Sequence, residues 1–242
     1  MSEDHTPSKP DPHTKGILGE DRFPECTGAT AQGFLNRHLE LFLTLCLAVG
    51  LVCGALAVLV NSFNSEEPPF LGWSIGLYVI PPALLGWLAV RPWSATVGGS
   101  VSYLAAVLGD LAVTTSTAND PNVLEYTAWF FVGLTLGALL GFLGNRIRSH
   151  AAGARAFATG FPLGLMALFL WMSIRAQAET GDRIVHPAVY LLEGSLALVI
   201  LMVCRGWAAR GAALLCAVAL VIPFVFALIP LFLLVWYASG DY

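Results

Sequence analysis

The stretch Leu124–His150, LEYTAWFFVGLTLGALLGFLGNRIRSH, decides the fold class of this chain. Between Thr127 and Asn145 it contains no charged residue. At about 1.5 Å per helical residue, this run crosses most of the roughly 30 Å hydrocarbon core of a bilayer. Two arginines, Arg146 and Arg148, follow the run directly. The stretch therefore predicts a membrane-spanning helix whose basic end lies at one membrane surface.

The composition of the whole chain agrees with this prediction. Of its 242 residues, 57% are hydrophobic and 12% are charged, whereas a soluble domain carries about 25% charged residues. Too few charges remain to solvate a globular surface. Lysine and arginine form no dense cluster, so we expect no nucleic-acid partner. The five cysteines include no CxxC pair, which favours a packing role over a disulfide or metal role.

Seven apolar runs along the chain predict an all-α fold, a polytopic transmembrane bundle of seven spanning helices. Each run is near the roughly 20 residues that a spanning helix needs, and the runs are continuous rather than alternating, unlike barrel strands. The predicted helices cover residues 39–63, 70–90, 95–115, 126–146, 155–174, 187–204 and 211–237. Residues 1–33 are polar and proline-rich, so we expect a disordered tail followed by a transmembrane domain over 34–242.

The basic residues predict the orientation of the bundle. If the amino terminus is cytoplasmic, seven crossings leave only Arg175 and Arg183 outside, and the carboxyl terminus lies outside as well. The inner side then holds all the other basic residues: Lys9, Lys15, Arg22, Arg37, Arg91, Arg146, Arg148, Arg155, Arg205 and Arg210. This asymmetry predicts a multi-pass protein with a cytoplasmic amino terminus.

Glycines spaced four residues apart predict close helix packing. Gly133, Gly137 and Gly141 share one face of the central helix, and Gly50 and Gly54 share a face of the first. In lipid, close backbone approach is a main source of helix attraction. Two interpretations stay open: helix contacts within the chain, or a homo- or hetero-oligomer that forms through these glycine faces.

Prolines lie inside several predicted helices. Pro81 and Pro82 fall near the middle of 70–90, and Pro162 falls within 155–174. Because proline removes a backbone donor, we expect kinks or interruptions at these positions. Broken helices line substrate sites in transporters, but proline is also common in spanning helices for structural reasons.

Two acids, Asp110 and Glu193, lie well inside apolar runs. Each lies five or six residues from the predicted outer end of its helix, so both are expected at one depth. A charged side chain at the bilayer centre costs about 2.5–3.5 kcal/mol, so each acid needs a partner, water or a proton. The groups predicted to lie near them are Arg175, His186, Tyr190 and Tyr103. They line either an outward-facing cavity for a cation, proton or small polar solute, or a static polar clamp between helices.

Sequence motifs for catalysis are sparse. The chain has no HExxH and no nucleotide-binding fingerprint. Gly72-Trp73-Ser74-Ile75-Gly76 matches Gly-x-Ser-x-Gly, but it opens a predicted spanning helix instead of following a strand. Its serine would need His186 as a base. We therefore expect no enzymatic activity, no cofactor and no bound metal.

The short basic turns, Arg91-Pro92-Trp93 and Arg205-Gly206-Trp207, connect helices rich in alanine, glycine and leucine. Together with the polar tail, they resemble small multi-pass membrane proteins of unknown function from actinobacteria. This resemblance implies a plasma-membrane location and supplies no activity. The first functional hypothesis is a small-solute or ion permease, or a subunit of one. The alternatives are a structural or assembly partner of another membrane protein and an intramembrane enzyme.

Overall fold

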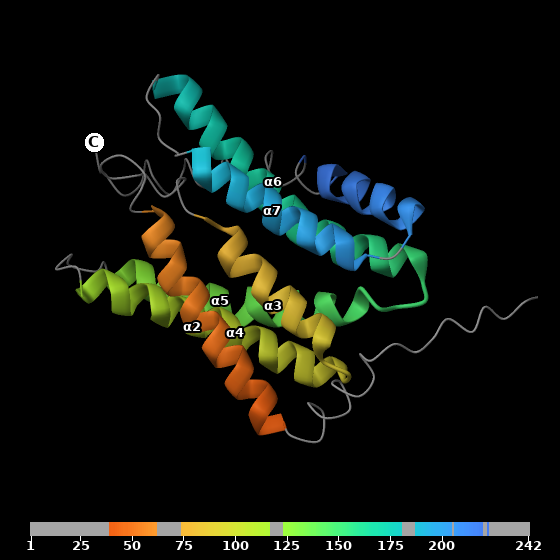
Figure 1. Ribbon diagram of the computed structural model, residues 1–242, viewed down its shortest axis with the longest axis horizontal. Helices are drawn as coiled ribbons and strands as arrows, with labels where there is room; N and C mark the ends of the chain where they lie inside the picture. Colours follow the sequence, from red (N-terminus) through yellow and green to blue (C-terminus); the bar gives the residue numbers. More distant parts are fainter. Residues whose placement is uncertain are drawn as a thin grey trace, which may run out of the picture.

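The computed structural model of the chain describes residues 39–61, 74–116, 123–180, 187–204, 206–219 and 222. All regular secondary structure in these residues is helical (Figure 1), which confirms the all-α fold class for this part of the chain. The helices are α2 (Leu39–Asn61), α3 (Gly76–Leu88), α4 (Pro92–Ser116), α5 (Val123–Arg146), α6 (Ala152–Thr180), α7 (Pro187–Val203) and a further helix, Trp207–Ala219. The predicted tail over 1–33 and the predicted helical residues 223–237 lie outside the described residues.

By length and composition, four of the described helices can cross a membrane. The spans are Leu39–Val60, Pro92–Ser116, Tyr126–Arg146 and Ala152–Arg175. The helices α3, α7 and Trp207–Ala219 are apolar but have only 10–17 residues in their described parts. The described helices are thus those of a membrane protein, and four of them are long enough to cross the bilayer.

The prolines do not interrupt their helices. Pro81 and Pro82 lie inside a continuous α3, and Pro162 lies inside a continuous α6. The expected interruption at Pro162 is therefore wrong. A spanning helix tolerates proline because its neighbours can satisfy the backbone groups that proline leaves free.

Helices α2, α3, α4 and α5 pack closely together, while α6 and α7 contact each other and touch α3 and α5 over a smaller area (Figure 1). The backbones of α2 and α4 are in close contact where the two helices cross. A Cβ atom added at Gly50 would lie 2.2 Å from the carbonyl oxygen of Ser102, and one added at Gly54 would lie 1.9 Å from that of Ala106. Only glycine permits this approach.

The glycine face of α5 lies against α4 in the same way. A Cβ added at Gly141 would lie 2.1 Å from the carbonyl oxygen of Ala95, and one at Gly137 would lie 2.8 Å from that of Gly99. One at Gly133 would lie 2.6 Å from the ring of Tyr103. This face of α5 is therefore occupied within the chain.

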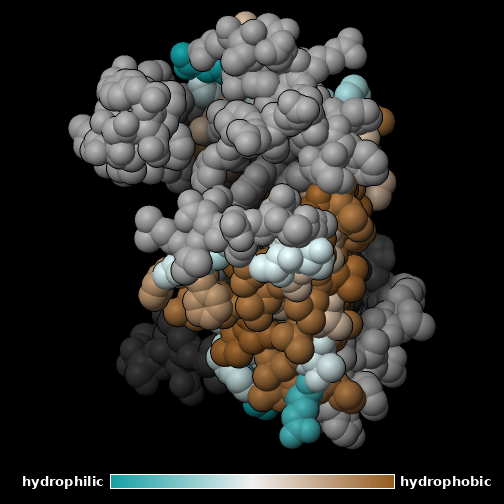
Figure 2. Space-filling view, turned by 90° about the vertical axis from the view of Figure 1, so that its left-hand side faces the viewer, coloured by the Kyte–Doolittle hydropathy of each residue, from teal (hydrophilic) through white to brown (hydrophobic). Residues whose placement is uncertain are grey.

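The outer surface of the bundle is apolar. Large hydrophobic side chains are exposed on α2, α5 and α7, including Val52, Phe131 and Leu191. Figure 2 shows a face on which hydrophobic side chains cover most of the described surface. An exposed apolar surface of this extent is suited to contact with lipid chains instead of water.

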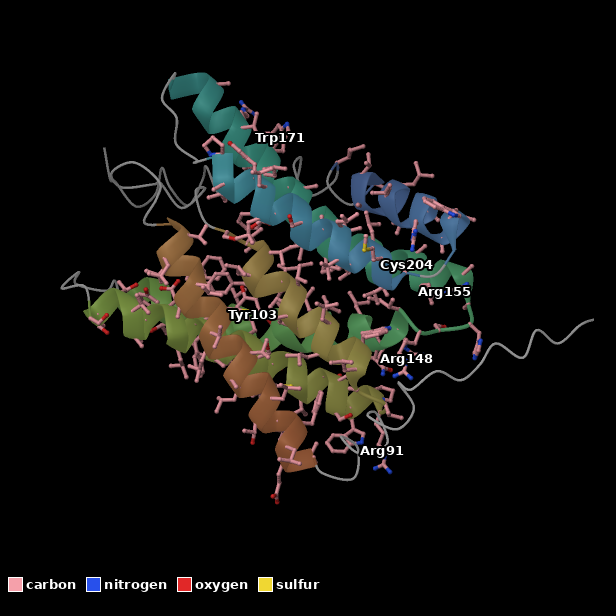
Figure 3. All side chains as sticks on the ribbon, viewed as in Figure 1. Arg91, Tyr103, Arg148, Arg155, Trp171 and Cys204 are labelled. Carbon is pink, nitrogen blue, oxygen red and sulfur yellow. The ribbon has the colours of Figure 1, made fainter. Side chains whose placement is uncertain are left out.

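Basic side chains gather at one end of the bundle. In Figure 3, Arg91, Arg148 and Arg155 lie towards the same end of the helices, and Trp171 lies towards the opposite end. Arg148 donates a hydrogen bond of 3.3 Å to the carbonyl oxygen of Trp87, at the end of α3. The turns that connect the helices at this end are therefore the basic ones.

Candidate functional site

Glu193 of α7 binds the beginning of α3. Its side chain is 6% exposed. Its Oε1 accepts hydrogen bonds from the Ser74 hydroxyl at 2.8 Å and from the Gly76 backbone N–H at 2.9 Å, and its Oε2 lies 3.1 Å from the same N–H. The first N–H groups of a helix lack partners within the helix, and the helix dipole favours an anion there. Glu193 thus caps α3 from another helix, which is the geometry of a polar clamp.

Asp110 of α4 lies at the meeting point of three helices. Its side chain is 7% exposed. Tyr126 of α5 donates a 2.6 Å hydrogen bond to Oδ1, and Thr114, one turn later on α4, donates to the same atom at 3.2 Å. Tyr78 of α3 donates a short hydrogen bond to Oδ2. The carboxylate is therefore held by three hydroxyl groups.

The two acids differ in how their charge is compensated. Among the described residues, neither has a basic side chain as a partner. Glu193 faces the amino-terminal, positive end of the α3 dipole, whereas the partners of Asp110 among the described residues are neutral hydroxyl groups. A buried anion without a compensating charge is costly. Glu193 is therefore the acid for which the structure shows a compensating positive dipole.

A small cavity lies beside Asp110. Its volume is about 10 Å³, close to the space that one water molecule occupies. Its lining consists of Ile75, Tyr78, Val107, Asp110, Tyr126 and Trp129. Tyr126 and Trp129 are only half-buried, so the cavity is walled on this side by rings that are partly exposed. Glu193 does not line it.

In the structure, the side chains of the predicted polar cluster do not all lie together. Tyr103 is fully buried, and its ring centroid lies 5.9 Å from that of Tyr78, but in the described part of the chain its hydroxyl has no hydrogen-bond partner. The guanidinium of Arg175 lies 5.6 Å from the centre of the Trp171 ring, on α6. Tyr190 is half-buried on α7.

His186 lies outside the described residues. Among the described residues, the segment that begins α3 connects the two acids: residues 74 and 76 bind Glu193, and residue 78 binds Asp110.

Sequence reasoning missed the hydroxyl and aromatic groups around Asp110. Thr114 follows Asp110 by four residues and so lies on the same helix face. Tyr126 and Trp129 are three apart and share a face of α5. These spacings were visible in the sequence, but which helix faces Asp110 was not.

Comparison with known proteins identifies a family for this chain but no activity. No curated protein and no protein of solved structure matches the chain significantly. The model of a family described as a family of unknown function, DUF6518, matches residues 35–234, which include every described helix. The chain therefore belongs to the DUF6518 family.

Proposed function

We propose that this protein is a small-solute or ion permease, or a subunit of one, and that it binds a cation at Asp110. The observation that supports the proposal is a buried carboxylate beside a cavity, held by hydroxyl groups and without a basic partner in the described part of the chain. Ionisable residues inside spanning helices commonly mark ion, proton or substrate paths.

The hydrogen bonds of Asp110 leave one acceptor position of the carboxylate unused. A carboxylate has about four lone-pair positions. Two donors, Tyr126 and Thr114, approach Oδ1, and one, Tyr78, approaches Oδ2. One acceptor position on Oδ2 is thus available for a cation or a proton, which would neutralise the buried charge.

The proposed topology has seven spans with the amino terminus in the cytoplasm and the protein in the plasma membrane. The gathering of Arg91, Arg148 and Arg155 at one end supports this orientation, because cytoplasmic loops carry an excess of basic residues (Figure 3). Asp110 then lies six residues, or about 9 Å, from the outer end of α4 at Ser116. A cation would reach it from the outer side.

The two alternative hypotheses, an assembly partner and an intramembrane enzyme, have less support. An oligomer through the glycine faces would compete with α4, which already covers Gly137 and Gly141. An intramembrane enzyme built on Ser74 would need that hydroxyl within reach of a substrate, yet the Ser74 side chain is fully buried.

The proposal is tested with purified protein reconstituted into vesicles. Cation gradients are applied, and charge movement is recorded on a solid-supported membrane. We expect Asp110→Asn, which keeps the side-chain shape, to abolish cation-dependent currents, while Glu193→Gln, the matched change in the other acid, keeps them. Equal currents in the Asp110→Asn variant and the unchanged protein would refute a role for Asp110.

A further inference from the structure

We infer that the basic end of the bundle holds a binding site for an anionic phospholipid, whose phosphate group lies in a cavity beside Arg91. The inference goes beyond the proposed cation binding and does not depend on it. The cavity lies where α4 begins, whereas Asp110 lies six residues before α4 ends. Three features carry the inference: the shape and lining of the cavity, its unused hydrogen-bond donors and an exposed apolar face that leads away from it.

The cavity lies where the beginnings of α2 and α4 meet the end of α3. Its volume is about 30 Å³, about two to three times the least space that one water molecule needs. This space accommodates the two non-bridging oxygens of a phosphodiester. The polar wall is formed by Arg91, Trp93 and Ser94, and the apolar wall includes Leu39, Phe42 and Leu88. The cavity is thus amphipathic, as a lipid headgroup site must be.

The polar wall offers donors that the protein does not use itself. Arg91 is exposed, and its guanidinium forms no hydrogen bond or ion pair in the part of the chain that the structure describes. The indole N–H of the half-exposed Trp93 likewise has no partner there. Both groups can only donate. The Ser94 hydroxyl, in contrast, donates to the carbonyl oxygen of Arg91 at 2.8 Å. Positive charge and free N–H donors select an anion with oxygen acceptors, and a guanidinium matches phosphate with two parallel hydrogen bonds.

Three other arginines of the basic turns make contacts within the chain. Arg148 donates to carbonyl oxygens at the end of α3, and Arg210 donates to that of Cys204, directly after α7, at 3.0 Å. The guanidinium of Arg146 lies 5.0 Å from the centre of an aromatic ring of its own helix. These side chains stabilise helix ends. Arg91 differs from them because the structure gives its side chain a cavity and no partner among the described residues.

An exposed apolar face leads from the cavity along α4. Trp93, Val97 and Leu108 are all exposed, and their spacings of four and eleven residues place them on one helix face. Tryptophan and arginine at the end of a spanning helix mark the membrane surface. A phospholipid has its phosphate at that level and its acyl chains below it, so one molecule can contact both the cavity and the apolar face. A soluble phosphate would use only the cavity.

The charge of the site favours an anionic lipid over a zwitterionic one. In phosphatidylcholine the choline group cancels the phosphate charge, whereas in phosphatidylglycerol the phosphate charge remains. An arginine near an anionic lipid surface contributes about a fivefold gain in affinity. In the proposed topology, this end of the bundle faces the cytoplasmic leaflet, whose anionic lipids attract basic segments next to the membrane.

The experiment measures lipid binding to the full-length protein by native mass spectrometry from detergent micelles. The probes are phosphatidylglycerol, phosphatidylcholine and diacylglycerol with identical acyl chains, and glycerol phosphate serves as a soluble competitor. We expect phosphatidylglycerol to bind about fivefold or more tightly than phosphatidylcholine. Diacylglycerol, which lacks the phosphate, should bind most weakly, and glycerol phosphate should not displace phosphatidylglycerol at equal concentration.

Variants assign the binding to the cavity. Arg91→Gln should weaken phosphatidylglycerol binding about fivefold and remove the preference over phosphatidylcholine. Arg91→Lys, which keeps the charge but loses the two parallel hydrogen bonds, should lie between Arg91→Gln and the unchanged protein. The matched control is Arg146→Gln, because it removes the same charge from an exposed arginine that does not line the cavity. It should bind as the unchanged protein does. Near-ultraviolet circular dichroism and gel filtration check that each variant is folded.

Four outcomes would overturn the inference. Equal affinities for phosphatidylglycerol and phosphatidylcholine would show that charge is not recognised. An unchanged preference in Arg91→Gln would place the binding elsewhere, and an equal loss in Arg146→Gln would reduce it to general surface charge. Displacement of the lipid by glycerol phosphate at equal concentration would assign the cavity to a soluble phosphate. None of these outcomes affects the proposed role of Asp110, which the cation-dependent currents test separately.

Discussion

Replacing one glycine at the contact of α4 with α5 should cost more stability than replacing a glycine with space around it. Gly141 and Gly194 are both helical. A Cβ at Gly141 would lie 2.1 Å from the carbonyl oxygen of Ala95 and 2.9 Å from the Cα of Gly99, whereas a Cβ at Gly194 would have no atom within 4 Å. The two substitutions, Gly141→Ala and Gly194→Ala, therefore form a matched pair.

The expected loss of stability in Gly141→Ala follows from the geometry of this contact. Ordinary van der Waals contact begins at 3.4 Å, so the backbones at Gly141 must separate by 1.3 Å (3.4 − 2.1). The obstacle is a backbone oxygen, which cannot rotate away. Overpacking of this kind costs about 1–3 kcal/mol. Alanine also gains about 1 kcal/mol over glycine in a helix, but both variants gain it, so the difference between them isolates the steric cost.

The assay is reversible unfolding in mixed micelles with increasing sodium dodecyl sulfate, followed by tryptophan fluorescence. We expect Gly194→Ala to be as stable as the unchanged protein or more stable, and Gly141→Ala to have a free energy of unfolding lower than that of Gly194→Ala by about 1–3 kcal/mol. Equal stabilities of the two variants would refute the close approach of α4 to α5 at this point.

Three further predictions concern the buried polar groups and the topology. Glu193→Ala should lower the free energy of unfolding by about 2–4 kcal/mol, since it leaves the cap of α3 unpaired, and Glu193→Gln should lower it less; the same unfolding assay measures both. Tyr103→Phe should raise the free energy of unfolding by about 1 kcal/mol because it removes a buried hydroxyl without a partner, whereas Tyr78→Phe, which removes a bond to a carboxylate, should lower it; equal effects in that assay would contradict the assignment. In a background without the native cysteines, Thr115→Cys should react with a membrane-impermeant maleimide in intact cells, and Ser149→Cys should react only after lysis; the reverse pattern would invert the topology.

The helices themselves were predictable because the physics of a span is local. A continuous apolar run must satisfy its backbone internally, so it must be helical, and its length is fixed by the bilayer. The ends of the helices were less predictable. The predicted helix 155–174 stops where the polarity rises at Arg175, yet α6 continues to Thr180. Hydropathy marks where a helix leaves lipid, whereas the helix itself ends only where its backbone hydrogen bonds end.

For the candidate site, the direction in which each acid faces could not be predicted from the sequence. Counting residues from the helix ends predicted one level for Asp110 and Glu193, and in the structure both bind groups within residues 74–78, where α3 begins. Which neighbour each acid faces depends on how its helix is rotated about its axis. That rotation is set by packing, such as the contact of Gly109 with the backbone of Leu51, and no local sequence pattern records it.

The direction each acid faces decides its chemistry. Glu193 points to the beginning of a helix, where unpaired N–H groups supply the positive end of a dipole. Asp110 lies six residues before the end of α4, and its partners among the described residues are neutral hydroxyl groups. Hydroxyl groups orient a carboxylate but do not neutralise it. Two acids that look equivalent in the sequence therefore differ in their partners, and replacing each by its amide should show whether they also differ in their effect on stability and on the proposed cation binding.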